Sequence, residues 1–326
     1  MWSLSRALPL SRPQVLGRPL SALRLSSLMS TSTSPASVVP PATPRPSASL
    51  VIINSRNEVL FVHRNPVARS FAGVHVFPGG NLDAKQDASL AECAIRETFE
   101  ESGILLASGP APSDDVLDMA RHAIHAGQTP FRQFLSEHGL VADVQALLPF
   151  TQWITPVFAP RRFHTSFFIA FLGSASASGF SSGAREDRIP KPDGGQEVIA
   201  ARFVHPDAVL AEFGAGKITL MPPQFYIVYT LASILRGGAT TAEQRARVEK
   251  LARGGFGSMV INPRRLGKAE EGRVTLTYEG DHTRGGPEGR LHRAHVRSGK
   301  GGITTEIKLE RNFDIFTEIN VVASKL

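Results

Sequence analysis

Three glutamates, Glu97, Glu100 and Glu101, occupy neighbouring positions in a segment with helical periodicity. Because an α-helix turns about 100° per residue, their carboxylates project within an arc of about 100° on one face. Like charges at these spacings each destabilise a helix by about 0.2–0.5 kcal/mol unless a positive group lies against them. Mg²⁺ prefers carboxylate oxygens, so a divalent-metal site is one interpretation, and a solvated acidic face is the other.

A helix over residues 88–102 would carry these glutamates, with Asp87 available as its N-cap and Gly103 as its stop signal. The glycine pair Gly79 and Gly80 precedes the helix and would let backbone approach a ligand that a Cβ would exclude. This neighbourhood favours the metal site over the solvated surface. The residues expected to face the core are Leu90, Ala91, Ala94, Ile95, Thr98 and Phe99.

Gly80 and the run Arg96-Glu97-x-x-Glu100-Glu101-x-Gly103-Ile104 together resemble the Nudix hydrolase box. The resemblance implies the α/β fold of the Nudix α/β/α sandwich. It makes Glu97, Glu100 and Glu101 catalytic ligands of Mg²⁺ or Mn²⁺, with Arg96 orienting Glu97.

The chain departs from the Nudix box in three places, one of which is Thr98, where an aliphatic residue is usual. The interval from Gly80 to Arg96 is two residues longer than usual, and Ala88, with Asp87 beside it, stands where the family has an earlier glutamate. We therefore assign no fourth carboxylate ligand from Asp83, Asp87 or Glu92. Farther along the chain, Glu197 matches a late carboxylate that some Nudix enzymes use as an extra ligand or base, although a polar position at a strand start explains it nearly as well.

Upstream of the box, Arg64, Arg69, Gly73 and Phe77 lead into Gly79 and Gly80 at fixed spacing. These residues resemble the coenzyme A signature of Nudix enzymes, which makes all six ligand-binding candidates. Coenzyme A carries a diphosphate and a 3′-phosphate, and guanidinium groups bind phosphates bidentately. Two unrelated surface arginines are the alternative interpretation.

A third segment, with Trp153, Pro156 and the run Pro160-Arg-Arg-Phe-His164, is similar to the peroxisomal acyl-CoA diphosphatase branch of the Nudix family. That branch usually has Asp where this chain has His164. The substitution leaves a packed or surface histidine and a functional histidine equally open at this position.

The two ends of the chain carry targeting features. The first 57 residues contain no Asp or Glu but six arginines, which is typical of an organellar presequence or of a disordered tail. The chain ends in Ser324-Lys325-Leu326, the tripeptide that the peroxisomal import receptor binds. We expect a peroxisomal protein, and the Arg-rich tail raises the mitochondrion as a second destination. A start at Met29 would remove most of that tail.

Composition excludes several other classes of protein. No apolar run reaches membrane-spanning length, and the single cysteine, Cys93, permits no intrachain disulfide framework and no cysteine-based zinc ribbon. The net charge of +7 raises nucleic acid as a partner, but the basic residues are not interleaved with aromatic ones. We expect no nucleic-acid partner.

The order of expected elements divides the chain into three parts: a tail over 1–45, a Nudix hydrolase domain over 46–236 and a β-rich extension over 237–326. A helical insertion over 108–150, with helices expected at 114–125 and 131–138, is predicted to cap the site. In the extension we expect a helix over 241–253 and strands over 258–261, 273–278, 292–297 and 304–309.

The resemblance implies metal-dependent hydrolysis of the diphosphate bond of coenzyme A or acyl-CoA. The products would be adenosine 3′,5′-bisphosphate and 4′-phosphopantetheine or its acyl form, with Glu101 or Glu197 accepting a proton from water. Another nucleoside diphosphate derivative, such as NADH, ADP-ribose or an RNA cap, is the alternative substrate. A catalytically silent Nudix-fold binding module is the alternative of another class.

Overall fold

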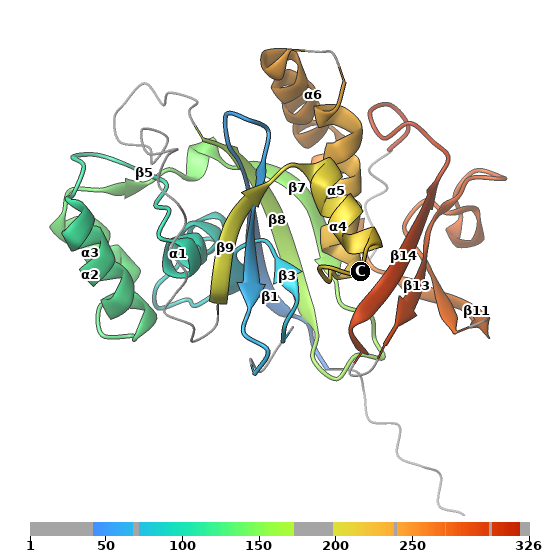
Figure 1. The fold of residues 1–326 in the computed structure, drawn as a ribbon, viewed down its shortest axis with the longest axis horizontal. Coiled ribbons are helices and arrows are strands. Elements are labelled where there is room, and N and C mark those ends of the chain that lie inside the picture. The colour runs from blue at the N-terminus through green and yellow to red at the C-terminus, as the bar shows by residue number, and fades with distance from the viewer. Residues whose placement is uncertain are drawn as a thin grey trace, which may run out of the picture. The chain divides into compact units, whose positions relative to one another are not determined.

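The computed structural model describes residues 42–67, 72–172, 198–237, 240–270, 272–299 and 302–319, without the side chains of 268–270. These residues all belong to one compact unit, Pro41–Leu326 (Figure 1). Arg69, Glu197, the N-terminal tail to residue 41 and the tripeptide Ser324-Lys325-Leu326 lie outside the described residues.

The centre of the unit is a mixed sheet of eight described strands in the order β10-β7-β8-β1-β2-β3, with β4 also paired to β1 and β9 to β2. Strand β1 runs parallel to β8 from the Arg45–Phe163 pair to the Ile53–Phe171 pair. The strands are β1 (Arg45–Ile53), β2 (Val59–Arg64), β3 (His75–Val76), β4 (Gly79–Asn81), β7 (Leu148–Ile154), β8 (Phe163–Phe171), β9 (Val198–Val204) and β10 (Val260–Ile261).

Strand β1 is apolar on both faces because helices cover both sides of the sheet. Leu50 and Ile52 belong to the core on one face, whereas Val51 and Ile53 belong to the core on the other. A continuous run of large aliphatic residues is typical of such a doubly covered strand. Strand β1 thus contributes to both cores. It also pairs with β4, which precedes the helix that carries Glu97, Glu100 and Glu101.

The glutamate helix α1 spans Leu90–Ser102 and ends at Gly103, whose φ of 77° puts it in the left-handed conformation that favours glycine. The predicted N-cap was wrong: Ser89, not Asp87, caps the helix. The Ser89 hydroxyl accepts from the Glu92 N–H at 3.1 Å, while the Glu92 carboxylate accepts from the Ala88 N–H at 2.8 Å. This reciprocal pair satisfies two free backbone donors at the helix start, which leaves Asp87 available for another contact.

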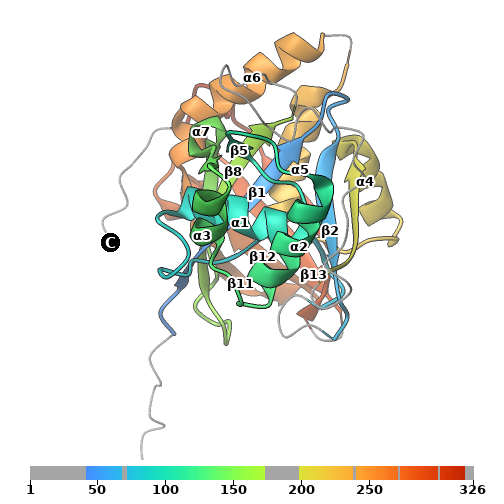
Figure 2. The ribbon, with the colours of Figure 1, turned by 90° about the vertical axis from the view of Figure 1, so that its left-hand side faces the viewer.

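The insertion after α1 forms two helices, as predicted, and packs on the side of α1 that faces away from the sheet (Figures 1 and 2). Phe99 of α1 stacks on Phe134 of the insertion at a ring-centroid distance of 5.8 Å. The insertion comprises β5 (Ala107–Ser108), α2 (Asp114–His125), α3 (Phe131–Glu137), β6 (Val141–Ala142) and η1 (Val144–Ala146).

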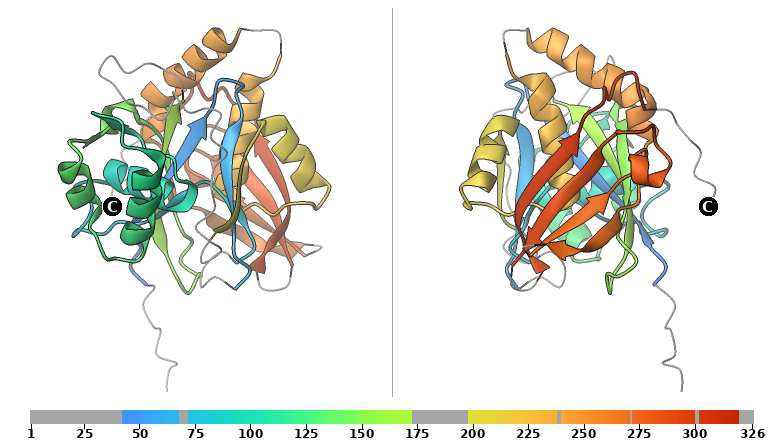
Figure 3. Two further views of the ribbon diagram at one scale, coloured as in Figure 1. Left: turned by 60° about the vertical axis from the view of Figure 1, so that its left-hand side comes forward. Right: turned by 90° about the vertical axis from the view of Figure 1, so that its right-hand side faces the viewer.

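The opposite face of the sheet is covered by α5 (Pro222–Leu235), which also packs against the second sheet (Figure 3). A helix enclosed on both sides is expected to be apolar around most of its circumference, and α5 is. The second sheet has the order β11-β12-β13-β14, with strands Arg264–Glu270, Arg273–Thr277, His292–Ser298 and Thr304–Arg311. The remaining helices are α4 (Pro206–Gly214), α6 (Thr241–Arg253), α7 (Gly255–Ser258) and η3 (His282–Arg284).

These layers confirm the predicted α/β fold with a helical insertion and a β-rich C-terminal extension. One detail of the extension was wrong: residue 258 ends the short helix α7, and only Val260–Ile261 form a strand. That strand joins the main sheet beside β7, and a single hydrophobic core includes residues on both sides of the predicted boundary after Arg236. No helix among the described residues is long and apolar enough to cross a membrane.

His292 is a buried polar residue where α5 meets the second sheet. Its Nε2 lies 2.8 Å from the Tyr226 hydroxyl, and its Nδ1 lies 2.7 Å from the Glu279 carbonyl oxygen. A carbonyl oxygen only accepts, so Nδ1 carries the hydrogen and Nε2 accepts from Tyr226. Burial lowers the pKa of His292 from 6.5 to about 4, because a charged imidazole would lose its hydration.

Because the folded-state pKa of His292 lies below the unfolded value, this residue should destabilise the fold as pH falls from about 6.5 toward 4. The loss should reach up to about 3 kcal/mol of unfolding free energy. Urea titrations of wild type and His292→Gln across this pH range should show a flatter dependence in the variant. His282→Gln, at an exposed histidine, should keep the wild-type slope; equal slopes for wild type and His292→Gln would contradict the assignment.

Candidate active site

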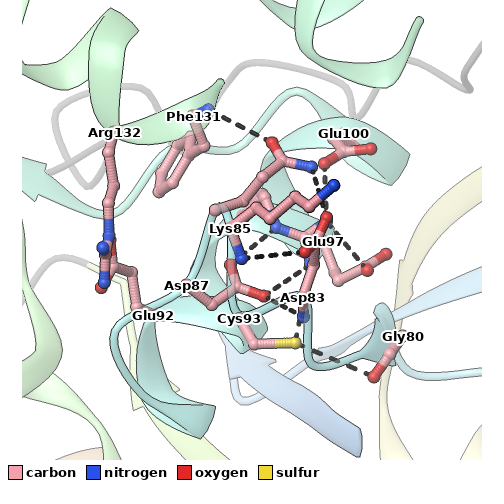
Figure 4. Close-up of polar contacts among 12 residues, drawn as sticks. Gly80, Asp83, Lys85, Asp87, Glu92, Cys93, Glu97, Glu100, Phe131 and Arg132 are labelled. Atoms are coloured by element: carbon pink, nitrogen blue, oxygen red, sulfur yellow. Dashed lines mark hydrogen bonds and ion pairs between the residues drawn. The ribbon is translucent and has the colours of Figure 1, made fainter. Parts of the chain in front are cut away.

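Arg96 is a buried guanidinium that contacts Asp87, Glu97 and Glu100, three carboxylates that are labelled in Figure 4. Its Nε and Nη2 donate to the two carboxylate oxygens of Asp87 at 2.7 and 2.8 Å. Its Nη1 lies 2.8 Å from Oε1 of Glu100 and 2.9 Å from Oε1 of Glu97. One nitrogen therefore gathers two of the three predicted ligands, while Asp87 fixes the plane of the guanidinium. The predicted contact between Arg96 and Glu97 is present.

The Gly79-Gly80 pair lies directly against two of the carboxylates. A Cβ at Gly80 would sit 2.3 Å from the carboxyl carbon of Glu97, and the Gly79 N–H donates to Oε2 of Glu101 at 3.1 Å. A Cβ at Gly79 would instead meet the backbone oxygen of Ala48 at 2.4 Å. Both glycines thus lie close to a neighbouring group, but Gly80 faces the end of a side chain and Gly79 faces the backbone of the neighbouring strand.

Arg64 reaches the same cluster from strand β2. Its Nη1 lies 3.1 Å from Oε1 of Glu101, and both side chains are largely buried. Along β2, Leu60 packs in the core on the α1 side and Phe61 in the core on the other side, so the alternation of the strand also turns Arg64 toward α1. The structure therefore brings a residue of the upstream arginine motif to the carboxylate helix.

The insertion adds two residues that the sequence did not single out. Arg121 of α2 donates from Nε to the backbone oxygen of Glu100 at 2.8 Å, and His125 places Nδ1 3.4 Å from Oε2 of the same residue. These contacts join segments that are separated by more than twenty residues. The only signal in the sequence was that Arg121 and His125 are one helical turn apart, so their side chains can reach the same residue.

Burial raises the pKa of Glu97 to about 7; Arg96 opposes this shift, and neighbouring Glu100 adds to it. The positive charge around Glu97 therefore does not fully compensate its desolvation. A hard divalent cation would supply the missing charge, and the carboxylate oxygens are the donors it prefers. The donor chemistry of the three glutamates therefore suits such an ion. As arranged, no three His, Cys, Asp or Glu side chains among the described residues form a group that could hold one, so binding would require these carboxylates to move closer together.

The other predicted binding residues have more local roles. Gly73 has a φ of 69°, a left-handed conformation suited to glycine. Phe77 is buried, with its ring centroid 4.9 Å from that of Phe61, so its side chain packs in the core and only its backbone borders the glycine pair.

The position of His164 was left open by the sequence. Its Nε2 lies 2.8 Å from Oε1 of Gln152 on the adjacent strand. Arg69 and Glu197 lie outside the described residues, and their roles stay predictions.

Comparison with known families agrees with this geometry. Residues 43–123 match the family model described as "NUDIX domain". The glutamate helix lies within this matched segment, in agreement with the resemblance of its sequence to the Nudix box. Within that family, residues 84–231 match the model described as "NUDT19 Nudix domain".

Several curated proteins are similar to parts of the chain. "Acyl-coenzyme A diphosphatase NUDT19" of Gallus gallus is 34% identical over 156 residues, which cover 41% of this chain and 38% of that protein. The Xenopus laevis protein of the same name is 30% identical over 152 residues, covering 41% of this chain and 37% of that protein. "Putative nudix hydrolase 7" of Caenorhabditis elegans is 28% identical over 199 residues, covering 58% and 61%. The chain thus spans less than two thirds of the length of these relatives.

Among solved structures, a NUDIX hydrolase from Alicyclobacillus acidocaldarius aligns with a TM-score of 0.47 at 24% sequence identity. The alignment covers 60% of this chain and 94% of that chain.

The two glycines should respond differently to alanine. In Gly80→Ala the added Cβ meets only the mobile end of Glu97, so we expect the fold to persist while Mn²⁺ affinity falls about tenfold or more. In Gly79→Ala the Cβ meets backbone, so unfolding free energy should drop by about 1–3 kcal/mol. Thermal melts and Mn²⁺ titrations followed by electron paramagnetic resonance separate the two effects. Wild-type Mn²⁺ affinity in Gly80→Ala would contradict the placement of Glu97.

Proposed function

We propose that this protein is a Nudix diphosphatase that hydrolyses the diphosphate bond of coenzyme A or acyl-CoA. The observation that carries the proposal is the convergence of Glu97, Glu100 and Glu101 around Arg96 and the glycine pair, with Arg64 of the upstream motif bonded to the same cluster. The relatives named acyl-coenzyme A diphosphatase support this substrate class. The products would be adenosine 3′,5′-bisphosphate and 4′-phosphopantetheine or its acyl form.

The protein's own residues have distinct roles in this mechanism. Glu97, Glu100 and Glu101 would hold Mg²⁺ or Mn²⁺, which when bound neutralises diphosphate charge and makes water a better nucleophile. Arg96 keeps two of these carboxylates together, and the glycine pair allows backbone to lie beside them. Arg64 places a guanidinium at the edge of the cluster, where it can also bind a substrate phosphate. Glu101 or Glu197 would accept the proton of the attacking water.

The alternatives differ in substrate or in catalysis. A site for NADH, ADP-ribose or an RNA cap would use the same carboxylates but would not need the arginine motif before the glycine pair. A silent binding module would not need all three glutamates, and all three are present here. These alternatives are distinguished by measuring the hydrolysis rates of coenzyme A, short and long acyl-CoA, NADH and ADP-ribose under one metal condition.

Glu100→Gln should leave the protein folded but lower the rate of acyl-CoA hydrolysis by about 100-fold or more, because a neutral amide stabilises a divalent cation less than a carboxylate does. Chromatography with mass detection would follow release of both products in the presence of Mn²⁺. Glu92→Gln is the matched control: it lies on the same helix, but its carboxylate bonds the Ala88 N–H and Arg132 instead of the cluster. Wild-type turnover in Glu100→Gln would remove the metal-ligand assignment.

We further propose that Ser324-Lys325-Leu326 directs the protein to the peroxisome through the import receptor, and that the Arg-rich tail before Met29 provides a second, mitochondrial route. Fluorescent fusions that leave Leu326 free should label peroxisomes. The form started at Met29 should lose any mitochondrial signal, and deletion of the last three residues should disperse the peroxisomal signal. Mitochondrial labelling by the short form would refute the role of the tail.

A further inference from the structure

Two side chains of the insertion, Arg121 and His125, contact the same residue of the glutamate helix, Glu100. Arg121 and His125 lie one turn apart on α2 and therefore project from the same side of that helix. Leu117 and Ile124 of the same helix are buried in the core around α1, which holds α2 in place. Both polar contacts end on Glu100, one on its backbone oxygen and the other on its carboxylate.

Arg121 donates a hydrogen bond to a backbone carbonyl group in the last turn of α1. The last four carbonyl groups of a helix have no partner within the helix, and a cation there is favoured by the helix dipole. No basic residue lies in the last turn of α1 itself. Arg121, which is 3% exposed, donates from Nε to the Glu100 oxygen at 2.8 Å and supplies both the hydrogen bond and the positive charge.

The contact of His125 concerns the side chain of Glu100. Arg96 of α1 holds Oε1 at 2.8 Å, and His125 of the insertion approaches Oε2 at 3.4 Å. Each carboxylate oxygen thus faces a nitrogen from a different segment. A side chain restrained at both oxygens and at its own backbone has few rotamers left, so less entropy is lost when it binds a cation.

We propose that Arg121 and His125 are positioning residues that orient Glu100 for metal binding, so that the insertion is a structural part of the metal site in addition to any role as a cap. This inference rests on the proposed function, because it takes Glu100 to be a metal ligand. It assigns the insertion a task that does not depend on which substrate is cleaved.

The decisive measurement is Mn²⁺ binding to the full chain without substrate, followed by electron paramagnetic resonance. His125→Ala should weaken Mn²⁺ affinity about tenfold, as loss of groups that orient a ligand typically does. His122→Ala is the matched control, because that histidine is exposed on the same helix and bonds the backbone oxygen of Asp118 at 2.7 Å. His125→Asn keeps a nitrogen donor near the place of Nδ1 and should restore most of the affinity.

A kinetic measurement separates positioning from simple loss of stability. In His125→Ala the Mn²⁺ concentration needed for half-maximal hydrolysis should rise about tenfold while the rate at saturating Mn²⁺ stays within about twofold of wild type. Arg121→Lys, which keeps the charge but not the geometry of the guanidinium, should show the same direction.

The outcomes separate the inference from the proposed function. Wild-type protein that binds no Mn²⁺ would overturn the proposed function. Wild-type binding with equal affinities for His125→Ala and His122→Ala would overturn only the role of the insertion. If His125→Ala does not fold, Arg121→Lys decides: Mn²⁺ affinity clearly below that of His122→Ala supports the inference, whereas affinity equal to that of His122→Ala contradicts it.

Discussion

The buried ion pair between Arg96 and Asp87 is the interaction on which the rest of the site depends. Two carboxylate oxygens hold the guanidinium at 2.7 and 2.8 Å, which leaves Nη1 to contact both Glu97 and Glu100. Removing one partner of such a buried pair typically costs about 3–5 kcal/mol, so the arrangement is strongly constrained. A glutamate cluster that would repel itself on an exposed helix is thereby kept together inside the protein.

The layers of the fold extend that constraint to the rest of the site. Strand β4 pairs with β1 in the centre of the sheet, so the glycine pair is fixed against a strand that is buried on both faces. Strand β2 brings Arg64 to Glu101 from the sheet side, and α2 brings Arg121 and His125 to Glu100 from the opposite side. The glutamate helix is thus held between two elements, and each contributes cationic or polar groups to a different carboxylate.

Local signals predicted much of this architecture. The periodicity of the glutamate helix, its stop at Gly103 and the two helices of the insertion are confirmed, because each depends on nearby residues. The choice of Ser89 over Asp87 as N-cap could not be read locally, since Asp87 is also a good cap and is used instead by Arg96, nine residues away. The contacts of Arg64 and His125 depend on how distant elements pack, which spacing along the chain does not encode.

The measurement that tests the central claim most directly is a Mn²⁺ titration of wild type and Asp87→Asn, with circular dichroism to verify folding. Asp87 contacts Arg96 and is not among the predicted ligands, so we expect its effect on metal binding to pass mainly through Arg96 and the orientation of Glu97 and Glu100. The account predicts that Asp87→Asn stays folded at 25 °C but binds Mn²⁺ about 10–100-fold more weakly. A folded Asp87→Asn protein with wild-type Mn²⁺ affinity would contradict it.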